Sequence, residues 1–459
     1  MQRCVVMETQ QKRNGRLALL GAAHSFNHSL FVIAPPLLSL IMADLGVAKS
    51  EIGLVSMIAS FIYGAGSLVG GPLGDRIGET KTIVVCLNIS GLSTYIMLAA
   101  WATRTIYIYA LGLISMAIWA SLYHPTANSF ISKAFRGRVA EAMGLHGVGG
   151  TLGVVLTPTV AWFIGASFGW SWAFVAFGSL SFLLALFFAD KYMRARLASF
   201  ILCLVSFAFF CYELLQYRML TAMVLSWVLA LCFILLLRSL GGERQVFREG
   251  KRVNGGSILD ALKIRELWIL LLFNVAIGLF MKGIELFFPT YLKENRGVDP
   301  MWASVAYTLI LATGVPAQWI GGKAADLVGS KKVLIATSLG VCVSLLALLL
   351  TPLYIVGIGI FIFLYGLSFY AHQPALNALT GFLSPQNQRG AVYGIFFFTS
   401  FGVGSLSQSI AGFIGDIYGL DMSFYILTVF AVIALLLSLK LPEKKEDKEI
   451  ATTSVYQEA

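Results

Sequence analysis

The chain has 459 residues, of which 58% are hydrophobic and only 12% are charged. A soluble domain carries about 25% charged residues, so this composition excludes a soluble protein and indicates one with many membrane spans. Backbone groups within lipid must be satisfied inside their own segment, so long continuous apolar runs predict spanning helices. A membrane β-barrel would require short alternating segments instead. The predicted fold class is therefore an all-α polytopic membrane protein.

The net charge of +10 is distributed unevenly along the chain. With the spans proposed below, most of the 33 Lys and Arg residues fall on one set of loops. The exceptions are Lys49, Arg104, Arg218, Lys293 and Arg296 on the opposite loops, and Lys282 within a span. This asymmetry follows the positive-inside rule, so we predict a multi-pass protein of the plasma membrane with cytoplasmic N- and C-termini. It also argues against a nucleic-acid partner.

In chain order, apolar segments of roughly 20 residues mark fourteen candidate spans. They cover residues 17–42, 51–73, 82–101, 105–132, 139–166, 170–189, 197–217, 219–237, 267–291, 301–322, 333–351, 354–382, 391–415 and 421–440. We divide the chain into a cytoplasmic N-terminus (1–16), an N-terminal six-helix bundle (17–196), an inserted transmembrane hairpin (197–238), a cytoplasmic linker (239–266), a C-terminal six-helix bundle (267–440) and a cytoplasmic tail (441–459).

A glycine-rich polar turn occurs twice, between the second and third spans of each bundle. Gly71, Asp75, Gly78 and Lys81 recur 251 residues later as Gly322, Asp326, Gly329 and Lys332. Farther along, Gly144, Gly165, Gly169 and Phe174 recur at an offset of 250 as Gly394, Gly415, Gly419 and Phe424. Such a nearly fixed offset in a membrane-like chain indicates an internal duplication, which is how many transporters are built.

This organisation resembles the major facilitator superfamily, with two six-helix halves and a Gly-x-x-x-Asp-x-x-Gly turn in each. The resemblance covers the chain except about residues 197–260. It implies two pseudo-symmetric bundles that rock to expose a central cavity to each side in turn. In the family the Asp of the turn docks against the other half and steadies the outward-open state. The implied gating motif comprises Gly71, Asp75, Arg76, Gly78, Gly322, Asp326 and Gly329.

Within the superfamily, short motifs resemble the fosmidomycin-resistance type of efflux protein. That group shows His-x-x-Asn-Asp in its first span, and here the stretch is His24-Ser25-Phe26-Asn27-His28, so a His replaces the acid. Its aromatic-His-Pro motif is Tyr123-His124-Pro125 here. The resemblance implies export of a small organic compound. The membrane Arg of many proton-coupled exporters would fall near Ile108 and is absent, so the sequence does not establish proton exchange.

Ionisable side chains inside a span are energetically expensive and mark candidate functional sites. Lys282 and Glu285 lie three residues apart on one helix face. The pair either neutralises itself and holds helices together, or Glu285 carries a proton while Lys282 holds an anionic group. His24 and His28 also share a face and are candidates to bind substrate or protons. A two-His metal site needs a third ligand, which the sequence does not place, so no metal is predicted.

Further polar groups lie beside helix-breaking prolines. His124 and Asn128 flank Pro125, and His372 and Asn377 flank Pro374, which suits either a hinge, a polar cavity wall or simple kinking. The candidates for substrate binding or coupling are therefore His24, Asn27, His28, His124, Asn128, Lys282, Glu285, His372 and Asn377. His146 in the fifth span and Glu213 in the inserted hairpin are weaker candidates.

No Walker A sequence, catalytic triad or zinc-protease signature is present in the sequence, and the six Cys residues form no metal-binding spacing. We therefore predict no enzyme activity and no cofactor. The first hypothesis is a secondary transporter, functional as a monomer in the bilayer, that exports a small organic solute by alternating access with coupling to protons. The second is an uptake carrier, symporter or uniporter, for a small organic anion. The third is a non-transporting membrane receptor or scaffold.

Overall fold

The computed structural model describes residues 2–135, 139–188, 265–384 and 389–442, and every regular element within these ranges is helical. The N-terminal bundle contains α1 (Gln2–Val32), α2 (Ala34–Leu45), α3 (Lys49–Ile77), α4 (Glu79–Ser93), α5 (Ile96–Thr103), α6 (Ile106–Ala120), α7 (Tyr123–Ala134), α8 (Val139–Phe168) and α9 (Trp170–Phe187). The predicted hairpin, 197–238, lies outside the described residues, as does most of the predicted linker, 239–266.

The C-terminal bundle repeats this pattern with more irregular helices. It contains α13 (Arg265–Arg296), α14 (Pro300–Val328), α15 (Ser330–Leu350), α16 (Tyr354–Ile360), η2 (Phe361–Tyr365), α17 (Gly366–Leu383), α18 (Arg389–Phe397), η3 (Phe398–Gly402), η4 (Val403–Ser405), α19 (Leu406–Tyr418) and α20 (Leu420–Leu439). Ten described segments are long and apolar enough to cross a membrane. The shorter apolar helix α9 and the continuous run from α18 to α19 complete the two bundles.

Several segments predicted as single helices are broken in the structure. The predicted span 17–42 is two helices, α1 and α2, because Pro35 and Pro36 occupy the first turn of α2, where proline starts a helix but cannot continue one. The predicted span 105–132 is likewise α6 and α7. Its break lies at Ser121, four residues before Pro125, where the proline ring clashes with a helical carbonyl.

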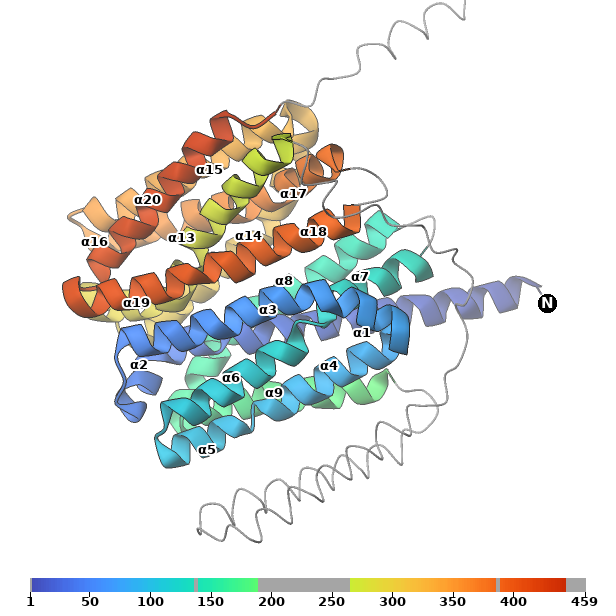
Figure 1. The fold of residues 1–459 in the computed structure, drawn as a ribbon, viewed down its shortest axis with the longest axis horizontal. Coiled ribbons are helices and arrows are strands. Elements are labelled where there is room, and N and C mark those ends of the chain that lie inside the picture. Colours follow the sequence, from blue (N-terminus) through green and yellow to red (C-terminus); the bar gives the residue numbers. More distant parts are fainter. Residues whose placement is uncertain (1, 136–138, 189–264, 385–388, 443–459) are drawn as a thin grey trace, which may run out of the picture.

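Figure 1 shows the two bundles side by side, the N-terminal bundle in blue to green and the C-terminal bundle in yellow to red. Between them α3 lies along α19, and α8 lies along α14. Small residues allow the first pair to approach closely. A Cβ atom on Gly53 would lie 2.5 Å from the carbonyl oxygen of Gln408, and one on Gly64 would lie 2.5 Å from the backbone nitrogen of Gly402. The backbones of α3 and α19 are therefore in contact.

Turns that the internal repeat predicts to be equivalent adopt the same backbone conformation. Gly78 has φ 96° and ψ 137°, and Gly329 has φ 93° and ψ 143°. Each ends one helix and begins the next, and its positive φ explains why both copies need glycine. Gly169 and Gly419 form a second pair (φ 101° and 82°), and Gly46 and Gly297 form a third, each with φ 64°. The last pair was missed in the sequence comparison.

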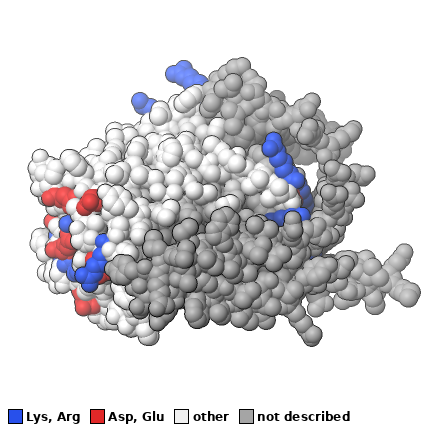
Figure 2. Space-filling model, turned by 60° about the horizontal axis from the view of Figure 1, so that its bottom comes forward, with Lys and Arg blue, Asp and Glu red and all other residues white. Residues whose placement is uncertain are grey.

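The two ends of the molecule differ in charge, as Figure 2 shows, with red and blue atoms mixed at one end and blue atoms at the other. The mixed-charge end carries Asp44, Lys49, Glu51, Arg104, Glu294, Arg296, Asp416 and Asp421. The basic end carries Arg16, Arg76, Lys81, Lys133, Arg265, Lys323, Lys331 and Lys332, together with Glu79 and Asp326.

Polar contacts join the two bundles at the mixed-charge end. The Asp416 carboxylate at the end of α19 accepts the backbone N–H groups of Lys49 at 2.9 Å and Ser50 at 2.8 Å, at the start of α3. The Lys49 ammonium also pairs with Glu294 of α13 at 3.1 Å. Both contacts cross from one bundle to the other, so this end is held closed.

Candidate substrate site

Several helices are irregular in both bundles. In the N-terminal bundle, α1 and α2 meet at a break, as do α6 and α7. In the C-terminal bundle, π-helical turns interrupt two helical segments, at Phe361–Tyr365 between α16 and α17 and at Phe398–Gly402 after α18. π-Helical turns are rare and are frequently found at functional sites, because they redirect side chains and free backbone groups. The polar side chains described next gather beside these interruptions.

Four histidines from three helices form one group, which we call the histidine cluster: His24 and His28 from α1, His124 from α7 and His146 from α8. The ring centroids of His24 and His28 lie 4.7 Å apart, and each lies 4.9–5.0 Å from that of His124. His146 stacks on His24 at 4.1 Å with only 7° between the ring planes. Three predicted site residues are thus brought together, and His146, a weaker candidate, joins them.

Hydrogen bonds orient two of these rings. The Nδ1 atom of His24 lies 2.8 Å from the carbonyl oxygen of His146. The Tyr123 hydroxyl donates to the Leu20 carbonyl at 2.6 Å and lies 3.1 Å from Nε2 of His146. In contrast, the buried Nε2 atoms of His24 and His124 have no hydrogen-bond partner among the described residues. A buried polar atom left without a partner costs about 1–3 kcal/mol, which favours a bound ligand or water at this place.

Asn27 is fully buried, and its side chain is used within the N-terminal bundle. Its amide donates to the Ala120 carbonyl at 3.0 Å, and its amide oxygen accepts the Tyr63 hydroxyl at 3.0 Å. Ala120 is the last residue of α6, so Asn27 satisfies a carbonyl near the break before α7. Asn27 therefore links α1 to α3 and to the end of α6.

In the C-terminal bundle, Lys282 and Glu285 of α13 form the predicted pair within one helix, with 2.6 Å between Nζ and a carboxylate oxygen. The Lys282 side chain is 9% exposed and that of Glu285 is 32% exposed. The Lys282 ammonium also lies 4.1 Å from the ring centroid of Phe401, a cation–π contact.

An aromatic layer separates the histidine cluster from Lys282. Phe397 and Phe401 stack at 4.5 Å, and Tyr63 lies within 6 Å of both rings. The Phe397 ring in turn lies 5.3 Å from that of His124. On the other side, Glu285 lines a narrow pocket, whose walls include Tyr307, Tyr365, Phe369 and Tyr370. An aromatic ring therefore lies against the ammonium, and other aromatic rings lie beside the carboxylate.

The remaining predicted residues lie elsewhere. His372 is buried in α17, where its Nδ1 bonds the carbonyl of Phe369, and no ring contact joins it to the histidine cluster within the described residues. Asn128 and Asn377 are exposed, and the backbone carbonyl of Asn377 accepts the Tyr393 hydroxyl at 2.9 Å. In the gating motif, Arg76 and Asp326 are exposed, and Gly322 lies near Pro374. The side chain of Asp75 and the surroundings of Gly71 are not among the described features.

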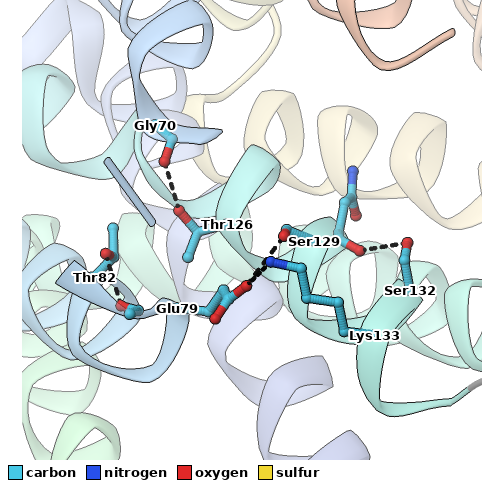
Figure 3. Close-up of polar contacts among 9 residues, drawn as sticks. Gly70, Glu79, Thr82, Thr126, Ser129, Ser132 and Lys133 are labelled. Carbon is cyan, nitrogen blue, oxygen red and sulfur yellow. Dashed lines mark hydrogen bonds and ion pairs between the residues drawn. The ribbon is translucent and has the colours of Figure 1, made fainter. Parts of the chain in front are cut away.

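The first gating turn has a polar partner that sequence reasoning missed. Figure 3 shows Glu79 pointing toward α7, where its carboxylate pairs with Lys133 and accepts the Ser129 hydroxyl at 3.2 Å. The Thr126 hydroxyl of the same helix lies 3.2 Å from the carbonyl oxygen of Gly70. Glu79 stands where the resembled family usually has a basic residue, and Lys133 in α7 supplies the positive charge instead. The turn is thereby fastened to α7.

Comparisons with known proteins support the same fold. The family model described as Major Facilitator Superfamily matches residues 17–408. A probable sulfoacetate transporter, SauU, from Cupriavidus necator is 25% identical over 62% of this chain, and the match spans only 59% of that relative's length. The fosmidomycin resistance protein of Escherichia coli is 22% identical over 94% of this chain and 93% of its own.

Among solved structures, a bacterial homolog to the human lysosomal transporter Spinster, crystallised inward-facing and unoccupied, is similar with a TM-score of 0.66. It is 17% identical and covers 94% of this chain and 97% of its own, so it bears on the fold alone. The expectation of a membrane transporter rather than an enzyme agrees with the family and with these relatives. With the family model spanning both bundles, the chain belongs to the major facilitator superfamily.

Proposed function

We propose that this protein is a secondary transporter that moves a small organic anion by alternating access, together with a proton. The observation that carries this proposal is the Lys282–Glu285 pair, which lies inside the spanning helix α13 with the Phe401 ring against the Lys282 ammonium. A charged side chain in the middle of a span costs roughly 2.5–3.5 kcal/mol on insertion scales, so a charge kept there usually serves a function.

Lys282 is the proposed anchor for the anionic group. Its present partners, the Glu285 carboxylate and the Phe401 ring, are both side-chain groups. A solute can replace either contact without disrupting a backbone hydrogen bond. A carboxylate, sulfonate or phosphonate could replace Glu285 at the ammonium while the rest of the solute lies against the aromatic layer. The name of one relative, a probable sulfoacetate transporter, refers to an anionic solute of this kind.

Coupling to protons follows from the same exchange. Once a solute takes Lys282, Glu285 is left as an unpaired carboxylate among aromatic side chains, and such a group is stabilised by taking up a proton. The solute and the proton therefore bind together and move in the same direction. Returning empty, the transporter re-forms the Lys282–Glu285 pair, which neutralises both charges for the return step.

The basic end is proposed to face the cytoplasm, because Lys and Arg concentrate there. The state described here is then closed toward the outside by the contacts of Asp416 and Glu294 with the start of α3. Export in exchange for protons is the second candidate. It is favoured by the alignment with the fosmidomycin resistance protein, which covers 94% of this chain at 22% identity. Function as a monomer in the plasma membrane remains part of the proposal.

Reconstituted vesicles test the two candidates directly. A panel of small carboxylates, sulfonates and phosphonates, with sulfoacetate as the first probe, is screened by thermal shift beside uncharged analogues of similar size, since a ligand that binds the folded state raises its melting point. Flux of a binding compound is then measured with the pH gradient imposed in each direction. Movement of the anion along the proton gradient supports cotransport, whereas movement against it supports exchange. Stabilisation by uncharged compounds alone would contradict the role of Lys282.

A further inference from the structure

We propose that His24, His28 and His124 form a binding site for a borderline divalent transition-metal ion such as Zn²⁺. One ligand nitrogen from each of the three side chains lies within 4.8 Å of the others. Three atoms at the corners of a triangle of that width lie at most about 2.8 Å from its centre, and Zn–N bonds are about 2.0–2.1 Å long. Each imidazole therefore needs to move by less than about 1 Å to bind a single ion.

The tautomer of His24 is arranged for metal binding. Its Nδ1 lies 2.8 Å from the His146 carbonyl oxygen, which can only accept, so Nδ1 carries the proton and Nε2 keeps its lone pair. That Nε2 atom is buried and has no hydrogen-bond partner among the described residues, and the same is true of Nε2 of His124. Metal-binding histidines characteristically donate their other N–H to a backbone carbonyl or carboxylate, which fixes the ring.

The surrounding residues make room for the His24 ring and hold it in place. A Cβ atom on Gly150 of α8 would lie 2.6 Å from the Cε1 and Nδ1 atoms of His24, so any larger residue there would displace the ring. A second restraint is His146 of the same helix, which stacks on the ring at 4.1 Å and contacts the Tyr123 hydroxyl. The position of the ring is therefore set by α8 as well as by α1.

The donor set selects the chemistry of the ion. The three converging ligands are imidazoles without a carboxylate, and imidazole suits Zn²⁺, Co²⁺, Ni²⁺ and Cu²⁺, whereas Mg²⁺ and Ca²⁺ prefer oxygen. Three protein ligands leave a fourth tetrahedral position for water or another small ligand. The stacked rings of Phe397 and Phe401 connect His124 to the Lys282 ammonium, so a divalent ion here would add positive charge near the proposed anion anchor.

The test uses the full chain with an affinity tag that contains neither His nor Cys. Protein purified in detergent and freed of metal with a chelator is titrated with Zn²⁺ in a calorimeter. We expect one tight site per chain. His28→Ala and His124→Ala should each weaken the affinity more than about 100-fold, since even second-shell changes cost roughly 10- to 100-fold. The matched control is His372→Ala, a buried histidine of the other bundle, which should leave the affinity unchanged.

Two further measurements separate ligand loss from misfolding. Size-exclusion profiles and metal-free melting points are compared for His28→Gln and His124→Gln, which keep a polar side chain but lack the imidazole. Co²⁺ replaces Zn²⁺ for spectroscopy, and intense visible bands of four-coordinate Co²⁺ are expected without a near-ultraviolet thiolate band. Unchanged Zn²⁺ affinity in a folded His28→Gln/His124→Gln double variant, or a thiolate band from cysteine, would overturn the site.

Discussion

The Asp416 carboxylate accepts the backbone N–H of Lys49 at 2.9 Å, which joins the end of α19 to the first turn of α3 across the bundle interface. A carboxylate at a helix N-terminus is stabilised by unpaired N–H groups and by the helix dipole, by about 0.3–1 kcal/mol at an exposed site. Because this contact exists only while the mixed-charge end is closed, it biases the transporter toward that state.

We therefore expect Asp416→Asn to shift the equilibrium toward opening of the mixed-charge end by roughly two- to fivefold. Distances between spin labels placed at the starts of α3 and α20 report this population. Asp299→Asn is the matched control, since Asp299 caps its own helix, α14, through the backbone N–H of Met301 at 2.8 Å. An equal shift in both variants would mean that capping, not the link between bundles, produces the effect.

The same contact predicts how closure depends on pH. Asp416 lies beyond the predicted span 391–415. Partial burial acts to raise the pKa of its carboxyl, but hydrogen bonds from Ser50 and Lys49 and the charge of Lys49 outweigh burial, so the pKa lies below its ordinary value. A depressed pKa in the closed state means that the carboxylate stabilises closure above the ordinary value of about 4, and that this is lost as the pH falls through the depressed value.

Label distances at the mixed-charge end should therefore stay constant from neutral pH down to about 4.5 and should lengthen only at lower pH. In Asp416→Asn this acid-dependent step should become smaller, because the amide does not titrate, while the Lys49–Glu294 pair across the same interface is left in place. Opening of the wild-type protein at pH 6, well above the titration range of this carboxyl, would show that another group controls the closed end.

The arrangement of the bundles was predictable from local sequence signals, because hydropathy and positive-φ glycines act over short stretches. Gly78 and Gly329 have matching backbone angles, as the repeat predicted. The break before Pro35 could also have been predicted, since two successive prolines favour the start of a new helix. The predicted span 17–42 did not include this break. Helix boundaries thus followed from residue chemistry even where the prediction placed them wrongly.

The candidate site could be predicted only in part, because it depends on which helices pack together. His24 and His28 are four residues apart, so helical periodicity places them on one face. His124 lies almost a hundred residues away, and only the packing of α7 beside α1 brings it to them. Asn27 lies between the two histidines in sequence, yet its amide satisfies the Ala120 carbonyl instead of facing the cluster. Spacing alone distinguishes none of these outcomes.

The pair of Glu79 and Lys133 should stabilise the first gating turn modestly, because the Lys133 side chain is 42% exposed and water screens the pair. A double-mutant cycle of Glu79→Gln and Lys133→Gln should give a coupling free energy of about 0.2–1 kcal/mol, measured by denaturant unfolding in detergent. Glu51→Gln combined with Lys133→Gln serves as the control, since Glu51 accepts a local hydrogen bond from the backbone N–H of Ala48, at the start of α3. The effects of the two control substitutions on the free energy of unfolding should be additive. Zero coupling in the Glu79 cycle would show that the Glu79–Lys133 contact does not stabilise the turn.

The proposed coupling mechanism predicts that Glu285→Gln separates solute transport from proton transport. Glutamine keeps the shape of the side chain but cannot bind a proton, and it leaves Lys282 with a neutral partner. Anion binding should strengthen, because the solute no longer displaces a carboxylate from the ammonium. Downhill anion exchange across vesicles should persist, while a pH gradient should no longer drive accumulation. Lys282→Gln is the complementary control, expected to lose anion binding while still inserting into membranes. Accumulation driven equally well by a pH gradient in Glu285→Gln would remove this carboxylate from the mechanism and leave the histidine cluster as the proton-binding group to test next.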